Sequence, residues 1–160
     1  MAAYPVTDAQ KIEWKQALKN ACLSLLHARI ANIEQAMLEA RESANSEEKS
    51  SAGDKYETSR AMGHLAQEMQ SKQLEEAKQE LDFANRLNIT TLFTSAATGA
   101  VVVCGEIIFY ISLGLGNTEV DGHKVMLLSS KAPIAASLFQ KKKGDTFVFN
   151  KKEVTIHDIF

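Results

Sequence analysis

The first half of the chain carries two stretches of apolar residues at helical spacing, separated by a short polar segment. The first stretch runs from Leu18 to Ala40 and the second from Met62 to Ala84. Residues 43–54, SANSEEKSSAGD, contain no large apolar side chain. Because residues three and four positions apart share one face of a helix, each stretch predicts a long helix with one apolar stripe. We therefore expect an antiparallel helical hairpin whose two stripes cover each other.

The predicted hairpin has a defined start and an expected length. Thr7 and Asp8 are residue types that cap helix N-termini, and they follow Pro5 shortly before the first apolar stretch. A helix of roughly 35 residues, rising about 1.5 Å per residue, is on the order of 50 Å long. A two-helix arm has no third layer over its outer faces, so we expect it to project from the rest of the protein.

The composition changes near residue 88, and we interpret this change as a domain boundary. Good helix formers such as Ala, Leu, Glu and Lys dominate before it, whereas Val, Ile, Phe, Thr and Gly dominate after it. The sequence thus predicts an α+β protein, with the hairpin in residues 1–88 and a compact unit in residues 89–160. Pro133 fits the first turn of a short helix over 133–140. Strands are expected over 99–113 (bent at 104–106), 124–128, 146–149 and 153–157.

Composition and charge limit the classes of function. The formal net charge is -2, so the chain lacks the basic excess that nucleic-acid-binding proteins usually carry. Cys22 and Cys104 lie in apolar stretches without a CxxC spacing, which indicates two buried thiols in a reducing compartment. The N-terminus has no secretory pattern, and residues 96–115 are too rich in glycine and β-branched residues for a membrane span. We therefore expect a cytoplasmic protein with no membrane partner.

No pattern typical of an enzyme active site stands out in the sequence. His27, His64, His123 and His157 are scattered, and none has a partner at metal-ligand spacing. The GLGN segment at 114–117 lacks the third glycine of a dinucleotide-binding loop, so we interpret it as a turn between strands.

Five lysines gather near the two turns of the last predicted hairpin, namely Lys141, Lys142, Lys143, Lys151 and Lys152. Lysines at the edge of a sheet prevent pairing with another sheet. The same residues could instead form a basic patch that meets an acidic protein surface or RNA. The sequence leaves both interpretations open.

Acidic residues crowd the polar turn of the predicted hairpin, namely Glu42, Glu47, Glu48, Asp54 and Glu57. Carboxylates on an exposed loop are usually only solvated. If the tip reaches an enclosed site, a pair of carboxylates can hold Mg²⁺ through one or two oxygens while the ion keeps its waters. Such an ion can activate a water for attack on a phosphodiester, especially as the second of two metals.

The order of the parts, an acidic-tipped hairpin followed by a small α+β unit, resembles the Gre transcript cleavage factors. Near the C-terminus, Pro133, Ile134, Leu138, Gly144 and Asp145 fall in the order and spacing of a family segment. Shorter segments also resemble the family, namely LEARE at 38–42, GDKYETSRAM at 53–62 and FYISLGLG at 109–116. The resemblance covers roughly the whole chain.

The resemblance implies an FKBP-like fold for residues 89–160 and insertion of the arm through the secondary channel of a bacterial multisubunit RNA polymerase. In the family, tip acids support the Mg²⁺ and water of the polymerase active site, while the polymerase itself cleaves the nascent RNA 3′ end of a backtracked complex. The protein would then activate another enzyme and have no cofactor of its own. The implied docking residues on the polymerase are Pro133, Ile134, Lys141, Lys142 and Lys143.

The acids of the tip differ in register from the family pattern, which reads Gly-Asp, two residues, Glu, and then Asn-Ala-Glu-Tyr. Here residues 53–57, GDKYE, keep the Gly-Asp-x-x-Glu spacing. Aligning the nearby tyrosine and arginine with those of the family instead brings Glu47 or Glu48 nearer the apex. We favour Asp54 and Glu57 as the pair that assists the Mg²⁺ and the cleavage, because residues three apart at a helix start share one face.

Three other interpretations of the sequence remain open. A longer, displaced tip could occlude the channel or alter initiation without stimulating cleavage. An FKBP-like fold could also belong to a peptidyl-prolyl isomerase, although core packing explains its candidate pocket aromatics equally well. These aromatics are Phe109, Tyr110, Phe139, Phe147 and Phe149. A plain coiled-coil adaptor would account for the first half alone.

Overall fold

The fold is α+β, with two long helices preceding a small sheet, as the sequence predicts. The structure, a computed structural model, describes residues 3–47 and 54–160, and for Glu47 and residues 54–56 it describes the backbone only. Among these residues, no helix has a segment long and apolar enough to cross a membrane. The elements in chain order are α1 (Asp8–Glu47), α2 (Asp54–Arg86), β1 (Val101–Cys104), β2 (Ile107–Ser112), β3 (Gly116–Val120), β4 (His123–Ser129), α3 (Pro133–Leu138), β5 (Thr146–Phe149), β6 (Lys152–Thr155) and β7 (Asp158–Ile159).

Packing divides the chain into two compact units. The sheet unit combines the residues up to Ser24 with Phe83–Phe160, and the hairpin unit comprises Leu25–Asp82. The start of α1 and the end of α2 therefore belong to the same unit as the strands, whereas the longer remaining parts of both helices form the hairpin unit.

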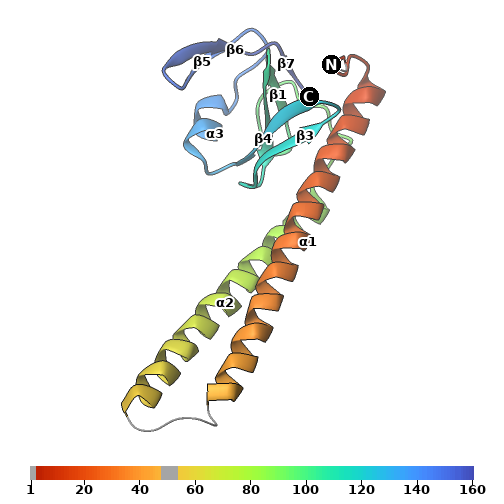
Figure 1. Ribbon diagram of the computed structural model, residues 1–160. Coiled ribbons are helices and arrows are strands. Elements are labelled where there is room, and N and C mark those ends of the chain that lie inside the picture. Colours follow the sequence, from red (N-terminus) through yellow and green to blue (C-terminus); the bar gives the residue numbers. More distant parts are fainter. Residues whose placement is uncertain (1–2, 48–53) are drawn as a thin grey trace. The chain divides into compact units, whose positions relative to one another are not determined.

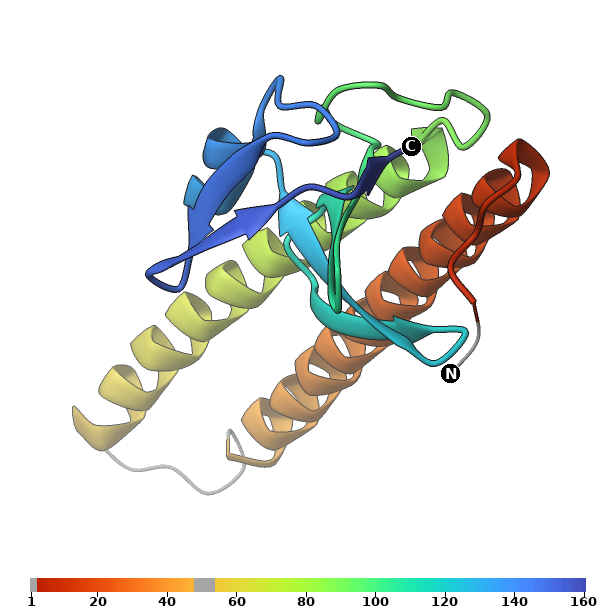
Figure 2. The same ribbon diagram turned by 90° about the horizontal axis from the view of Figure 1, so that it is seen from above.

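The hairpin unit consists of two helices that run side by side in opposite directions (Figure 1, Figure 2). Two ion pairs connect them: Arg29 Nη1 lies 2.9 Å from Glu80 Oε2, and Lys78 Nζ lies 3.9 Å from Glu34 Oε1. As the position on α1 advances from 29 to 34, its partner on α2 moves back from 80 to 78, which is the register of antiparallel helices. The predicted helical hairpin is therefore confirmed.

The two apolar stripes cover each other over only part of the hairpin unit. Ile30 and Ala77 are buried, but Met62, Leu65 and Met69 are 64%, 53% and 57% exposed. The prediction that this part of the second stripe packs against the first helix was wrong. Helical spacing identifies which side chains share a face, but it does not identify what that face meets.

The start of α1 is fixed by reciprocal hydrogen bonds between a side chain and the backbone. Thr7 Oγ1 accepts a 3.2 Å bond from the backbone N–H of Gln10, and Gln10 Oε1 accepts a 3.1 Å bond from the backbone N–H of Thr7. This capping box satisfies N–H groups that a helix start otherwise leaves without partners. The predicted helix start is confirmed, with Asp8 as the first helical residue.

The sheet unit is built on a five-stranded sheet with the order β3-β4-β2-β1-β7. β2 and β4 pair in parallel, whereas the other neighbours pair antiparallel. The predicted strand over 99–113 is two strands that pair Cys104 with Ile107 around the predicted bend. β5 and β6 form a separate two-stranded hairpin. The short edge strands β3 and β7 were not predicted, because GNTEV and DI show no hydrophobic alternation.

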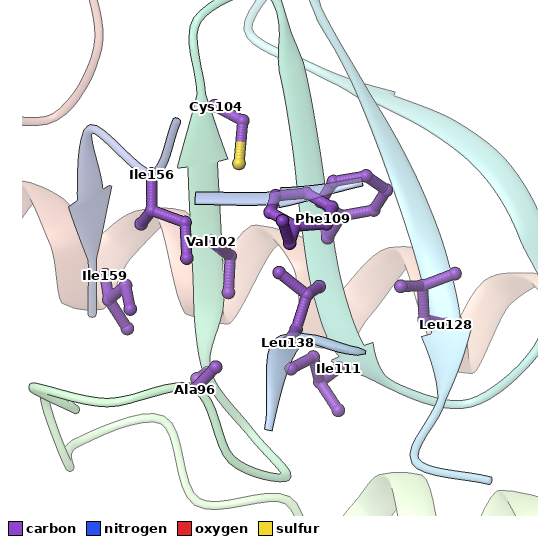
Figure 3. Packing of buried hydrophobic residues seen from close by; sticks show 11 residues of the cluster. Ala96, Val102, Cys104, Phe109, Ile111, Leu128, Leu138, Ile156 and Ile159 are labelled. Carbon is purple, nitrogen blue, oxygen red and sulfur yellow. The ribbon is translucent and has the colours of Figure 1, made fainter. Parts of the chain in front are cut away.

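One face of the sheet carries the main hydrophobic core (Figure 3). Val102, Phe109 and Ile111 belong to it from β1 and β2, and Leu138 of α3 and Phe147 of β5 pack in the same cluster. The ring of Phe109 meets that of Phe147 edge-on, with 6.0 Å between the ring centroids. Both α3 and the β5–β6 hairpin are thereby anchored to the sheet, so the segment between them is fixed at both ends.

The opposite face of the sheet is covered by the first part of α1. Side chains alternate along a strand, so Tyr110 and Ser112 point away from the main core. Ser112 Oγ lies 3.9 Å from Cys22 Sγ on α1, and Leu18 and Cys22 are fully buried. Cys104 is also buried, which confirms that both thiols are free and buried.

Candidate functional site

The candidate acids lie at the start of α2. Asp54 is its first residue and Glu57 follows within the first turn, so the predicted helical spacing of the two residues is confirmed. The side chain of Glu57 is exposed, and that of Asp54 lies outside the described side chains. Carboxylates are stabilised near a helix N-terminus by the helix dipole, so this placement is favourable without any ligand.

The alternative acids lie at the end of α1. Glu47 is the last residue of that helix, and Glu48 lies outside the described residues. α1 thus continues past residue 43, where its apolar pattern stops, because the following Ala, Asn, Ser and Glu residues include no proline or glycine. Acids therefore flank the connection between the helices on both sides, and the choice between the two registers stays open.

The described residues contain no group of three or more His, Cys, Asp or Glu side chains arranged to hold a metal ion. Mg²⁺ prefers six oxygen ligands and usually keeps several waters, binding through one or two carboxylates. Asp54 and Glu57 could therefore supply only part of its ligand set. The remaining ligands would have to come from water and from a second molecule.

The implied docking residues lie in α3 and in the segment that follows it. Pro133 begins α3 and is exposed, as are Lys142 and Lys143. Ile134 is half-buried and packs against the main core. Lys141 is half-buried, and its carbonyl oxygen accepts a 2.8 Å hydrogen bond from the N–H of Ala96. The accessible part of this set is therefore Pro133 with the two exposed lysines.

Residues that carry the family resemblance have clear structural roles in the sheet unit. Leu138 is fully buried in the core. Gly144 has a φ of +93°, a backbone conformation that favours glycine. Asp145 Oδ2 accepts a 2.7 Å hydrogen bond from the N–H of Lys142, which closes the turn before β5. This segment is thus explained by local folding as well as by docking.

The five lysines near the last hairpin do not form one cluster. Lys142 and Lys143 precede β5, whereas Lys151 and Lys152 lie at the turn between β5 and β6. Because the two strands pair antiparallel, the two lysine pairs lie at opposite ends of the hairpin. Four residues of strand separate them, which is roughly 13 Å at the usual rise. A partner would have to span the hairpin to meet both.

The aromatics considered for an isomerase pocket do not line one cavity. Phe109 and Phe147 are buried in the main core, whereas Tyr110 points to the opposite face of the sheet. Phe139 is 60% exposed. Phe149 packs edge-on against Phe109, with 5.4 Å between the ring centroids. Core packing accounts for these rings, with the exception of Phe139.

A buried lysine in the sheet unit was not singled out from the sequence. Lys15 on α1 is fully buried, its Nζ donates a 2.7 Å hydrogen bond to the carbonyl oxygen of Thr91, and it lies 4.6 Å from the ring centroid of Phe93. Burial lowers the pKa of Lys15 to about 8. The sequence contains no signal for this contact, because 76 positions separate the two bonded residues.

Comparison with known proteins gives no family for this chain: no protein-family model, no curated protein and no solved structure matches it. What is established is the class of fold, an α+β protein with a long antiparallel helical hairpin. Its function therefore rests on the residues described above.

Proposed function

We propose that this protein binds a multisubunit RNA polymerase and that its helical hairpin enters the secondary channel of that enzyme. The observation that carries the proposal is the position of the acids: Asp54 and Glu57 occupy the first turn of α2, next to the segment that joins the two helices. Carboxylates at the end of a helical hairpin can reach the interior of a narrow channel.

In the proposed mechanism, the polymerase cleaves its own backtracked RNA and this protein completes the site. Asp54 and Glu57 would contribute carboxylate oxygens to a polymerase-bound Mg²⁺, which supplies an activated water for attack on the phosphodiester near the RNA 3′ end. The two carboxylates also orient water by accepting hydrogen bonds. The protein acts as an activator and forms no covalent bond.

The sheet unit would hold the factor on the rim of the channel. We propose an FKBP-like relationship for this unit, in which α3 and the following segment face the polymerase. In this proposed docking surface, Pro133, Lys142 and Lys143 are exposed. The half-buried Ile134 and Lys141 would hold these three residues in place. A polymerase partner places the protein in the cytoplasm.

The proposal is tested by RNA cleavage in stalled elongation complexes. The variant Asp54→Ala/Glu57→Ala should still co-purify with the polymerase but should lose stimulated cleavage. The matched control is Glu39→Ala/Glu76→Ala, which removes two exposed carboxylates elsewhere on the same two helices. Unchanged cleavage by the first variant would show that the tip assignment is wrong. Failure of the unmodified protein to bind polymerase would reject the whole proposal.

A second candidate keeps the partner and omits the cleavage. It is favoured by the acids at the end of α1, because Glu47 is the last residue of that helix and Glu48 follows it in the sequence. In this register the tip would block the channel or alter initiation. Polymerase binding with reduced initiation and no added cleavage, abolished by Glu47→Ala/Glu48→Ala, would select this function.

A further inference from the structure

The hairpin unit contains an open cavity of about 500 Å³, lined by exposed and half-buried residues within 40–45 of α1 and 59–67 of α2. The volume falls in the range of small-molecule sites, which are usually about 300–1,000 Å³. We call it the distal cavity. Its described lining lies in the hairpin unit and includes neither Glu42 nor Glu57.

The distal cavity exists because neither helix fills the space between them here. Its neutral lining is made mostly of small Ala, Ser and Gly side chains. The large apolar residues Met62, Leu65 and Met69 of α2 are more than half exposed and are not among the described lining residues.

Within the described part of the chain, the charged side chains that line the distal cavity are two arginines. Arg41 comes from α1 and Arg60 from α2, and both are exposed. Glu42 and Glu68 neighbour lining residues in the sequence, yet neither lines the cavity. Among the described residues, no carboxylate lies within ion-pair distance of either guanidinium. Two cationic groups at one cavity repel each other, so an anion there would be favourable.

The geometry points to a binding site for a phosphate-bearing small molecule of the size of a mononucleotide. Guanidinium groups bind phosphate through paired, charge-assisted hydrogen bonds, and Arg41 and Arg60 can together balance a doubly charged phosphate monoester. The amides of Asn45 and Gln67, also in the lining, can both donate and accept hydrogen bonds to the polar edge of a base. This site goes beyond the proposed function, since it requires no polymerase.

The test is a calorimetric titration of the full chain, without polymerase, with a nucleoside 5′-monophosphate, the same nucleoside without phosphate, and inorganic phosphate. We expect saturable binding of the monophosphate, and affinity lower by about tenfold or more for the nucleoside, which is a difference that one lost charge-assisted contact can produce. Arg41→Gln/Arg60→Gln should reduce the affinity for the monophosphate by a similar factor. Arg60→Lys keeps the charge but not the paired hydrogen-bond geometry. Its affinity for the monophosphate should lie between those of the unmodified protein and the double variant.

The matched control is Lys124→Gln/Lys131→Gln, which removes the same charge from exposed positions of the sheet unit and should leave binding unchanged. Thermal unfolding of every variant establishes that it is folded. The proposal is overturned by any of three results: no saturable binding of the monophosphate at millimolar concentration, equal affinity for the nucleoside, or equal losses in the arginine and lysine variants. Binding of single-stranded RNA without binding of the monophosphate would also overturn it.

Discussion

Lys15 Nζ, on the fully buried side of α1, donates a 2.7 Å hydrogen bond to the backbone carbonyl oxygen of Thr91. One turn further along α1, Lys19 Nζ donates to the carbonyl oxygens of Asn85 and Leu87, at 2.6 and 3.0 Å. The last four carbonyl groups of a helix have no partner within it, and positive charge is favourable there. Lys19 therefore caps the C-terminal end of α2 through Asn85, and both lysines hold the segment that leads into the sheet.

The buried lysine makes stability depend on pH in a defined direction. Its pKa lies at about 8 in the folded protein against an ordinary value of 10.5, so unfolding takes up a proton between these values. The cost of burying the charge is complete below pH 8 and is relieved as the pH rises toward 10.5. Relative to Lys15→Met, the free energy of unfolding should therefore increase by about 3 kcal/mol across this window.

Urea unfolding of both proteins at intervals from pH 7 to pH 11 measures this difference. The comparison cancels the other titrating groups, which the two proteins share. Lys124→Met, at an exposed position of β4, serves as a second reference. A difference that stays constant over the window would show that Lys15 titrates normally and that its burial carries no charge penalty.

Two adjacent residues of the sheet unit should respond differently to substitution by alanine. Leu138 is fully buried in the main core, whereas Phe139, the next residue, is 60% exposed. Leu138→Ala should lower the free energy of unfolding by about 2–5 kcal/mol, because it removes buried methyl groups and leaves a cavity. Phe139→Ala should change it by less than about 0.5 kcal/mol. Chemical unfolding measures both, and a large loss for the second variant would mean that Phe139 is packed.

Several elements of this fold follow directly from local sequence signals. Thr7 and Gln10 form the capping box where the N-cap residues indicated a helix start, and Pro133 begins α3 as expected. These predictions succeed because each depends on residues within one turn of each other. The hairpin also follows from the sequence, since its two stripes and polar connection are local patterns.

Other features depend on contacts between distant residues and could not be derived in this way. The burial of Lys15 requires Thr91 and Phe93, which are remote in sequence. The exposure of Met62 and Met69 reflects the rotation of α2, which helical spacing leaves undetermined. For the candidate site, the sequence located the acids at the helix ends. It could not indicate the distal cavity, because small residues carry no periodic signal.

The two thiols should be almost unreactive in the folded protein. Cys22 is fully buried, and burial raises its pKa; burial also raises the pKa of Cys104 to about 11. The thiolate is the reactive form, so both inaccessibility and the raised pKa slow the reaction. At pH 8, an aromatic disulfide reagent should label both thiols only as fast as the protein unfolds. Addition of denaturant should expose two thiols at once, and rapid native labelling of either would contradict the buried placement.

At alkaline pH the same two thiols change the free energy of unfolding in the direction opposite to Lys15. Their pKa values are raised above the ordinary 9.0, so the folded state keeps protons that the unfolded state loses above this pH. Their contribution to stability is therefore present below pH 9 and lost as the pH rises above it, in the case of Cys104 toward 11. The variants Cys22→Ala and Cys104→Ala should each flatten this alkaline loss, as measured by urea unfolding.

The single tryptophan of the chain tests how α1 is joined to the sheet. Trp14 is 4% exposed, and its Nε1 donates a 2.9 Å hydrogen bond to Oδ2 of Asp121, in the turn between β3 and β4. Asp121 has a φ of 50°, which Asn and Asp tolerate better than other residues with a Cβ. Asp121→Ala removes the acceptor and strains the turn, and should cost about 1–3 kcal/mol, because a buried donor is left unpaired.

Asp121→Asn is the matched variant, since its side-chain oxygen can accept the same bond and its backbone suits the turn. It should retain most of the stability, and the tryptophan fluorescence should show a single unfolding transition at nearly the original denaturant concentration. Equal losses for the two variants would mean that the charge of Asp121, rather than its hydrogen bond, holds α1 against the sheet. In that case added salt should lower the free energy of unfolding of the unmodified protein by a similar amount, because screening reduces a charge interaction more than a neutral hydrogen bond.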